Sequence, residues 1–149
     1  MTTIYLQTEI KAPIHLVFDL SRSIDFHIAS AKETKEKVIA GRTCGLIGLN
    51  KTVTWKGKHF GFYLTHQSLI TSFEYPNSFT DEMIIGYFVS FKHQHHFYKT
   101  TSGTKMVDTL QYKTPLGFFG KLFNVLFLKR HLTKFLKIRN NAILLHLEK

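Results

Sequence analysis

Hydrophobic and polar residues alternate along most of the chain, which predicts a protein built mainly from β-strands. The first strand is expected at residues 4–10, where apolar side chains stand at positions 4, 6 and 10. Further strands are expected at 37–40, 52–56, 62–73, 79–89, 91–100 and 105–112. Consecutive strands usually pair with their neighbours, so we expect one curved antiparallel sheet of about seven strands.

Two short helices and one long helix complete the expected elements. Pro13 suits the first position of a helix, and Ser23 can cap the next one. Pro115 ends the sheet and opens a C-terminal helix that reaches near residue 147. That helix would be ~50 Å long at 1.5 Å per residue, whereas a domain of this size is ~30 Å wide. We therefore expect a break or bend near Gly117, Gly120 or the Lys129–Arg130 pair.

Length and composition indicate one folded domain spanning residues 1–149. Hydrophobic residues make up 44% of the chain, which excludes disorder as its main state. No apolar run is long enough for a transmembrane helix, and the N-terminus lacks the pattern of a signal peptide. The lone Cys44 cannot form an intrachain disulfide. Together these features favour a cytoplasmic location.

The chain is basic, with 20 Lys and Arg against 10 Asp and Glu and a formal net charge of +10. Residues 116–149 contain seven of the basic residues and only one acidic residue. A solvated helix face, an anionic membrane surface and nucleic acid are the possible explanations. Nucleic acid is the least favoured partner, because no recognition motif accompanies the charge.

Residues 116–128 form a strongly apolar stretch at the start of the expected C-terminal helix. Nine of these thirteen residues are apolar, and Lys121 is the only charged one. The stretch is too short to span a bilayer, but it could lie at a membrane interface. The preferred interpretation is a lid that packs on a pocket.

Gly41, Gly45 and Gly48 form a glycine-spaced loop that does not predict a cofactor site. The loop lacks the Gly-Lys-Ser/Thr ending of a P-loop and leads into a strand, so a helix N-terminus for phosphate is missing. We expect no cofactor.

Several segments resemble the START-like or Bet v 1-like superfamily, also called SRPBCC. The segments that carry the overall resemblance are Ala12–Pro13, Gly48–Asn50 before Thr52–Trp55, and Pro115–Gly117. A bacterial group loosely labelled cell-division inhibitor or ligand-binding protein is similar at residues 55–61, 81–83, 91–95 and 115–117. The resemblance implies an α+β helix-grip fold, in which a long C-terminal helix covers a cavity on the sheet. Lipid carriers, hormone receptors and cyclases share this superfamily, so the function stays open.

The strand at 91–100 predicts which side chains face the interior. Phe91, His93, His95 and Phe97 lie on one face, which the phenylalanines mark as the inner one. A two-residue turn at Ser102–Gly103 would place Phe97 opposite Asp108, His95 opposite Leu110 and His93 opposite Tyr112. Asp108 would then lie diagonal to His95.

The preceding strand is expected to pair with Phe88 opposite Phe91. That register places Ile84 opposite His95 and points Glu82 inward, diagonal to His95. Val89–Ser90 is a poor two-residue turn, so a slip of this register would reverse the face.

Three interpretations of the inner polar cluster remain open. The first is an internal network whose members satisfy one another. The second is a polar anchor for a mostly apolar ligand. The third is chemistry, with His95 as an acid or base beside Asp108, or with His93 and His95 as weak candidates for metal ligands.

The preferred function is binding of a hydrophobic or amphipathic small molecule between the sheet and the C-terminal helix. The expected ligand contacts are Trp55, Ile84, Phe88, Phe91, His93, His95, Phe97, Leu110, Tyr112, Leu122 and Leu126, with Phe18, Val53 and Leu64 as further wall residues. One alternative is a cyclase, dehydratase or isomerase that uses His95 and Asp108. Another is a membrane- or protein-interaction module that uses the basic C-terminal helix.

Overall fold

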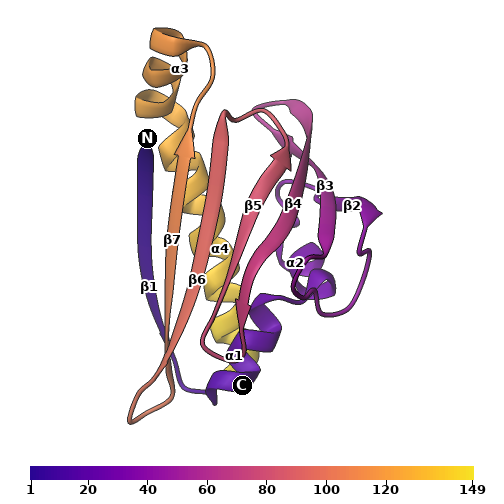
Figure 1. Cartoon of the computed structure of the whole chain (residues 1–149). Helices are drawn as coiled ribbons and strands as arrows, with labels where there is room; N and C mark the ends of the chain where they lie inside the picture. The colour runs from indigo at the N-terminus through magenta and orange to yellow at the C-terminus, as the bar shows by residue number, and fades with distance from the viewer.

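The computed structural model describes residues 1–149, which form one seven-stranded sheet and a set of helices (Figure 1). The strands are β1 (Thr2–Ile10), β2 (Lys37–Gly41), β3 (Thr52–His59), β4 (Phe62–Glu74), β5 (Ser78–Ile85), β6 (Ser90–Lys99) and β7 (Thr104–Lys113). The helices are α1 (Ile14–Ser21), α2 (Ile24–Ser30), α3 (Gly117–Phe123) and α4 (Lys129–Leu147), with a π-helical turn at Asn124–Leu128. None of the helices combines the length and the apolar character needed to cross a bilayer.

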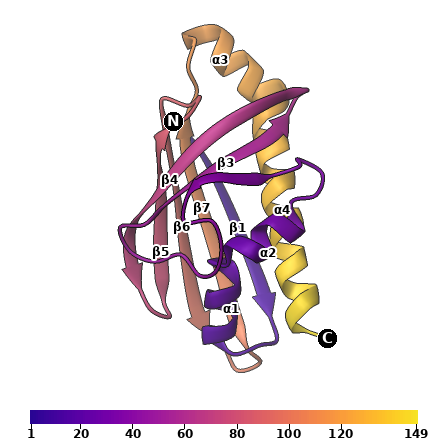
Figure 2. The ribbon, with the colours of Figure 1, turned by 90° about the vertical axis from the view of Figure 1, so that its right-hand side faces the viewer.

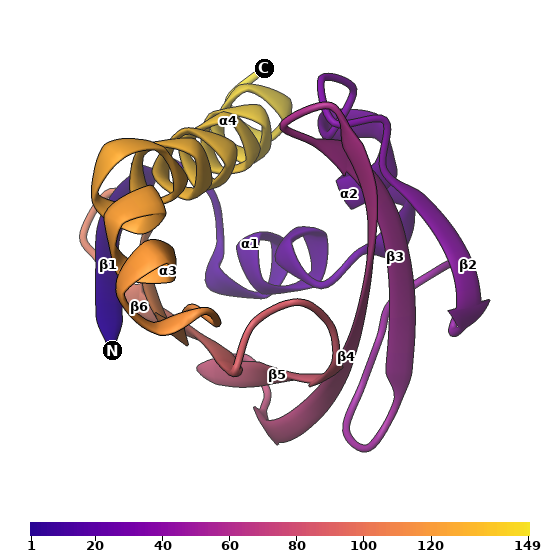
Figure 3. The ribbon, with the colours of Figure 1, turned by 90° about the horizontal axis from the view of Figure 1, so that it is seen from above.

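The strands pair in the order β1-β7-β6-β5-β4-β3-β2, and each pairing is antiparallel. Strands β2 to β7 form a meander, and β1 joins the free edge of β7. Seen from above, the sheet curves around the short helices, and α4 extends along its open side (Figures 2 and 3). The expected α+β helix-grip fold is therefore confirmed.

Local signals account for the two short helices. The Ser23 hydroxyl caps α2 by accepting a hydrogen bond from the Phe26 amide at 3.1 Å. Pro13 lies one residue before α1, in an extended conformation, instead of forming its first turn.

Aromatic packing around α1 fills one end of the sheet. The Phe18 ring is fully buried and meets four other rings edge-on, with centroids 5.1–5.4 Å apart: those of Phe73, Tyr75, Phe79 and Phe97. Edge-on ring contacts therefore connect α1 to β4, β5 and β6 at this end of the sheet.

The long C-terminal helix is interrupted, as its length predicts. The interruption is the π-helical turn, which ends where α4 begins at Lys129, one of the three expected places. Asn124 in this turn accepts a hydrogen bond from the Tyr112 hydroxyl at 2.6 Å and donates one to Thr2 at 2.9 Å. The turn is thereby tied to both β7 and β1.

Asp108 on β7 anchors α4 to the sheet through its fully buried carboxylate. Arg139 donates to one carboxylate oxygen and Asn140 donates to the other, each at 2.7 Å. Asn140 also reaches Thr8 on β1 at 3.3 Å, while His93 on β6 donates to Asp108 at 2.8 Å. One carboxylate thus joins three strands and the helix.

Charge balance makes this buried carboxylate stable in its ionised form. Burial opposes the ionisation of Asp108 most strongly, but the Arg139 charge and the hydrogen bonds from the histidines outweigh it. Together they hold the pKa of Asp108 well below its ordinary value.

The β6–β7 register differs from the expected one by two residues. The loop between the strands holds four residues, because Lys99 pairs with Thr104. His95 therefore lies directly opposite Asp108, whereas the two-residue turn placed Asp108 on the diagonal. A shift of two keeps every side chain on its face, so the inward positions of β6 were predicted correctly.

The β5–β6 register was predicted wrongly, and the error reverses a face. Phe79 lies opposite His95, and Asp81 lies opposite His93. An odd shift exchanges the faces of a strand, so Asp81 points inward and Glu82 faces Lys92 on the outer side. The cause is the end of β5 at Ile85, which leaves residues 86–89 outside the ladder.

Replacement of Asp108 by Asn should lower the free energy of unfolding by about 3–5 kcal/mol, because the buried charge of Arg139 loses its partner. Urea denaturation followed by the fluorescence of Trp55 measures this loss. The variant D108N should also lose less stability below about pH 4 than the wild type. The Asp108 contribution is complete above its unfolded pKa of about 3.9 and disappears as the pH falls toward the lower folded pKa.

The matched control is a double-mutant cycle with Arg139→Met. The two substitutions together should cost less than the sum of their separate effects, by about 1 kcal/mol or more. Strict additivity would show that the ion pair does not anchor the helix.

Gly41→Ala should destabilise the protein by about 1–3 kcal/mol, since Gly41 has φ +77° and an added Cβ would lie 2.5 Å from the Thr52 carbonyl oxygen. Gly48→Ala in the same loop is the control, because its Cβ would meet no atom within 4 Å. Urea midpoints that fall equally for both variants would contradict the strain at Gly41.

Candidate functional site

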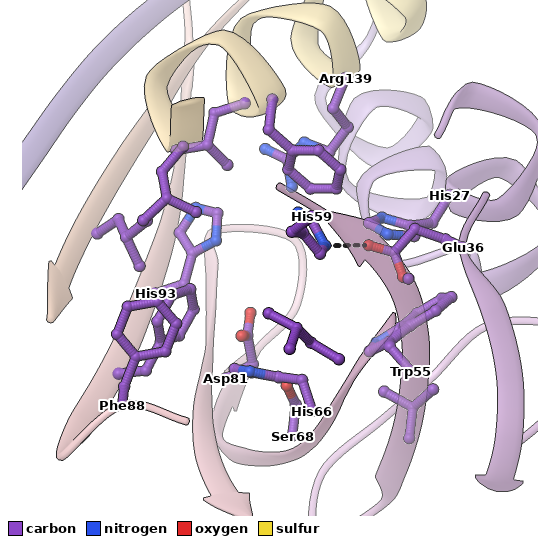
Figure 4. Close-up of a pocket in the computed structure, with 18 of the residues that line it drawn as sticks. His27, Glu36, Trp55, His59, His66, Ser68, Asp81, Phe88, His93 and Arg139 are labelled. Carbon is purple, nitrogen blue, oxygen red and sulfur yellow. Dashed lines mark ion pairs between the residues drawn. The ribbon is translucent and has the colours of Figure 1, made fainter. Parts of the chain in front are cut away.

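A cavity of about 380 Å³ lies between the inner face of the sheet and helices α2 and α4. Thirty-three residues line it, and 17 of them are hydrophobic. Figure 4 shows polar side chains entering it from the sheet, from α2 and from α4. The interior is therefore amphipathic.

The cavity opens at the end of the molecule where α3 lies. Three of its aromatic lining residues are exposed to solvent: Phe60, Tyr87 and Phe123. They come from the β3–β4 turn, the β5–β6 loop and α3, and the rings of Phe60 and Phe123 are 5.1 Å apart. This aromatic rim marks the mouth of the cavity.

Asp81, His93 and His95 form a polar cluster on the cavity wall. Nε2 of His95 lies 2.8 Å from a carboxylate oxygen of Asp81, and its Nδ1 lies 3.4 Å from Asp108. The rings of His93 and His95 stack at 3.7 Å, and Phe79 stacks on His95 at 4.1 Å. Strand pairing and ring stacking thus fix both imidazoles.

The pKa values of the two histidines shift in opposite directions. Burial lowers the pKa of His93, and the neighbouring His95 lowers it further. Burial acts most strongly to lower the pKa of His95, but its interactions with the Asp108 and Asp81 carboxylates together outweigh burial and raise it. Burial acts most strongly to raise the pKa of Asp81, but the hydrogen bond to His95 and the charges of the neighbouring histidines together lower it. Of the two histidines, His95 is therefore the one whose protonated form the neighbouring carboxylates favour.

A second polar cluster lines the cavity toward α2 and α4. His59 lies 3.3 Å from Glu36 (Figure 4). Its other ring nitrogen lies 2.8 Å from His131. One carboxylate oxygen of Glu36 is buried without a hydrogen-bond partner. Gly57 leaves room for this carboxylate, since a Cβ there would lie 2.5 Å from it.

His27 on α2 separates this second cluster from the tryptophan on β3. Its ring lies 4.3 Å from the ring of Trp55, and burial lowers its pKa to about 4. His27 is thus neutral near pH 7 and presents an aromatic surface to the cavity.

Most of the expected wall residues line the cavity. Those that do are Val53, Trp55, Leu64, Phe88, Phe91, His93, His95 and Leu110. Three others are buried in the core instead: Phe18, Phe97 and Tyr112. Phe18 and Phe97 belong to the aromatic packing around α1, and Tyr112 bonds to Asn124.

Three expected wall residues point away from the cavity and were predicted wrongly. Ile84 is 50% exposed because the β5 register reverses its face. Leu122 and Leu126, at 45% and 50% exposed, lie on α3 and the π-helical turn. The helix contacts the cavity farther along, through Leu128, Leu132, Phe135 and Leu136.

Several site residues were missed in the sequence. Asp81 was assigned to the outer face by the wrong register. Arg139 was read as part of a solvated basic face, although it is buried and lines the cavity. Glu36 and His59 come from segments without a regular pattern, and no local signal separates them from surface residues.

The polar groups of the first cluster differ in whether they can contact a bound molecule. Asp108 receives hydrogen bonds from Arg139, Asn140 and His93, so its capacity is used within the protein. Asp81 keeps 19% of its side chain exposed and lines the cavity. Asp81 and the histidines beside it are therefore the groups of this cluster that can meet a bound molecule.

Solved structures share this architecture over almost the whole chain. The TTHA0849 protein of Thermus thermophilus has a TM-score of 0.76 and 21% sequence identity, with 97% of this chain and 99% of that chain covered. Major latex-like protein 151 of Panax ginseng has a TM-score of 0.69 and 16% identity, with 98% and 97% covered. Ara h 8.0201 has a TM-score of 0.63 and 12% identity, with 96% and 97% covered.

Similarity at the level of sequence is weak. No protein-family model matches the chain, and no curated protein is significantly similar to it. The matched structures share too few residues to transfer a function. They establish that the chain has the Bet v 1-like helix-grip fold.

Proposed function

We propose that the protein binds an apolar or amphipathic small molecule in the cavity beneath α4. The observation that carries this proposal is the cavity itself, whose size of about 380 Å³ lies within the range of small-molecule sites. The superfamily that the sequence resembles includes lipid carriers, which supports the same function. The lone, exposed Cys44 is consistent with the cytoplasm as the location.

The chemistry of the walls favours an amphipathic molecule over a hydrocarbon. Leu110, Leu132 and Leu136 supply apolar surface, while Asp81 and His95 place a charged pair on the sheet side. A buried charged pair attracts a hydrogen-bonding group and leaves little gain for hydrocarbon alone. The ligand's polar group is therefore expected to lie near β5 and β6.

A second function is favoured by the exposed apolar surface of the segment 116–127. Its eight large apolar side chains are 41–80% exposed: Leu116, Phe118, Phe119, Leu122, Phe123, Val125, Leu126 and Phe127. The expected lid is thus incorrect for most of this stretch, since only Phe123 among the eight lines the cavity.

We infer that this surface docks on an anionic membrane. Apolar patches of this kind mark interaction sites. Lys121, Lys129 and Arg130 lie in or directly after the patch and would meet anionic headgroups. The mouth of the cavity opens beside it, so docking would bring the cavity next to the lipid.

A brominated long-chain fatty acid should quench the fluorescence of Trp55 in a saturable manner. Trp55 is the only tryptophan and lines the cavity, so quenching reports occupancy of the cavity. Leu132→Phe should weaken binding by roughly tenfold, because the larger ring takes space that the ligand needs. Fluorescence titration measures the Kd.

Leu126→Phe is the matched control for this experiment. It makes the same change in the π-helical turn that precedes α4, at an exposed side chain outside the cavity. Equal Kd values for both variants, or no quenching of the wild type, would contradict the proposed binding site.

Vesicles that contain phosphatidylserine should sediment the protein, and added salt should weaken that binding. The double variant with Phe118→Ser and Phe119→Ser should bind roughly tenfold or more weakly, because two large apolar side chains no longer enter the bilayer. Leu145→Ser, at an exposed apolar position far along α4, is the control. Equal sedimentation of the double variant and the wild type would rule out this surface.

A further inference from the structure

Three side chains with metal-ligating groups meet on two paired strands. Asp81 on β5 lies directly opposite His93 on β6, and His95 follows two residues later on the same face. One carboxylate oxygen and one ring nitrogen from each histidine lie within 4.8 Å of one another. Ligand atoms around a zinc ion are roughly 3.3 Å apart, given bonds of about 2.0–2.2 Å. Small movements of the three side chains would therefore bring these atoms to the spacing of metal ligands.

One of the two imidazoles, that of His93, is already held as a metal ligand usually is. A histidine that binds a metal commonly donates its second ring N–H to a carboxylate. Asp108 provides that carboxylate for His93, at 2.8 Å from its Nε2, whereas Nδ1 of His95 lies 3.4 Å from Asp108 and is buried without a hydrogen-bond partner. Nδ1 of His93 and Nε2 of His95 remain for an ion.

The local charges also fit a cation. Arg139 is matched by Asp108 at 2.7 Å, so its charge is neutralised within that pair. Asp81 remains as the negative group, and its carboxylate oxygen lies 2.8 Å from Nε2 of His95. This separation holds a shared proton, and a metal ion would replace that proton between the same two atoms.

We propose that Asp81, His93 and His95 bind one divalent first-row transition metal ion on the cavity wall. Two imidazoles and one carboxylate suit zinc, iron or cobalt, whereas magnesium and calcium prefer oxygen ligands alone. All three residues line the cavity, so the remaining coordination positions face it. The ion would bind whether or not the proposed ligand is present.

Titration of chelator-treated protein with Zn²⁺ tests the site. Isothermal calorimetry should show one ion per chain at this site, and Asp81→Asn or His93→Gln should weaken its binding by roughly tenfold or more. Circular dichroism verifies that each variant is folded. Co²⁺ added to the wild type gives an independent result, since its visible absorption reports imidazole coordination without any substitution.

His96→Gln is the matched control, because His96 lies on the same strand but on its outer face. This variant should bind Zn²⁺ as the wild type does. His131→Gln tests the second polar cluster and should also leave the affinity of this site unchanged. Loss of binding only in the His131 variant, or no saturable binding by the wild type, would overturn the proposal.

Leu132→Phe separates this proposal from the proposed function. The substitution blocks the cavity against the fatty acid but touches no metal ligand, so Zn²⁺ should still bind. Zinc binding without fatty-acid binding in the wild type would contradict the ligand-binding function and support the metal site.

Discussion

The buried carboxylate of Asp108 is the interaction on which the rest of the structure depends. Helix α4 crosses the open side of a curved sheet, and apolar packing alone would allow it to slide or rotate. Arg139 and Asn140 reach the carboxylate from α4, each at 2.7 Å. His93 reaches it from β6, at 2.8 Å. A buried charge tolerates little displacement of its partners, because each lost hydrogen bond leaves a costly unpaired group. Asp108 therefore fixes the position of the helix, and with it the width of the cavity.

The same constraint determines the protonation of the site. Asp108 stays ionised because Arg139 and the histidines outweigh its burial. Its negative charge and that of Asp81 then raise the pKa of His95, while burial and the neighbouring His95 lower the pKa of His93. An isolated histidine pair in an apolar cavity would lose its charge through desolvation. The cavity thus gains a charged group on its wall because a structural ion pair lies directly behind it. Asp108 therefore belongs both to the contacts that anchor α4 and to the polar cluster on the cavity wall.

Much of the fold could be predicted from the sequence, because strand alternation and turn residues are local signals. The inner face of β6 was predicted correctly for the same reason. Strand registers were harder to predict, since they depend on the loops between strands. The four-residue loop before β7 places Asp108 directly opposite His95. The early end of β5 makes Asp81, rather than Glu82, the acidic residue that points inward. The burial of Arg139 could not be predicted. Its partner lies 31 residues away, and its neighbours in sequence resemble a solvated helix face.

The C-terminal helix is anchored to the sheet near Arg139 and exposed to solvent at α3, so the two ends of the cavity differ. The part of α4 near Arg139 is bound to the sheet by buried charges, so the polar wall beneath it is fixed. Before the π-helical turn, α3 presents Phe118 and Phe119 to solvent at 72% and 75% exposure. It meets the β3–β4 turn through the rings of Phe123 and Phe60. Elements with few buried contacts open most easily. The end of the cavity at α3 is therefore where the proposed ligand would enter, and the anchored end is where its polar group would be held.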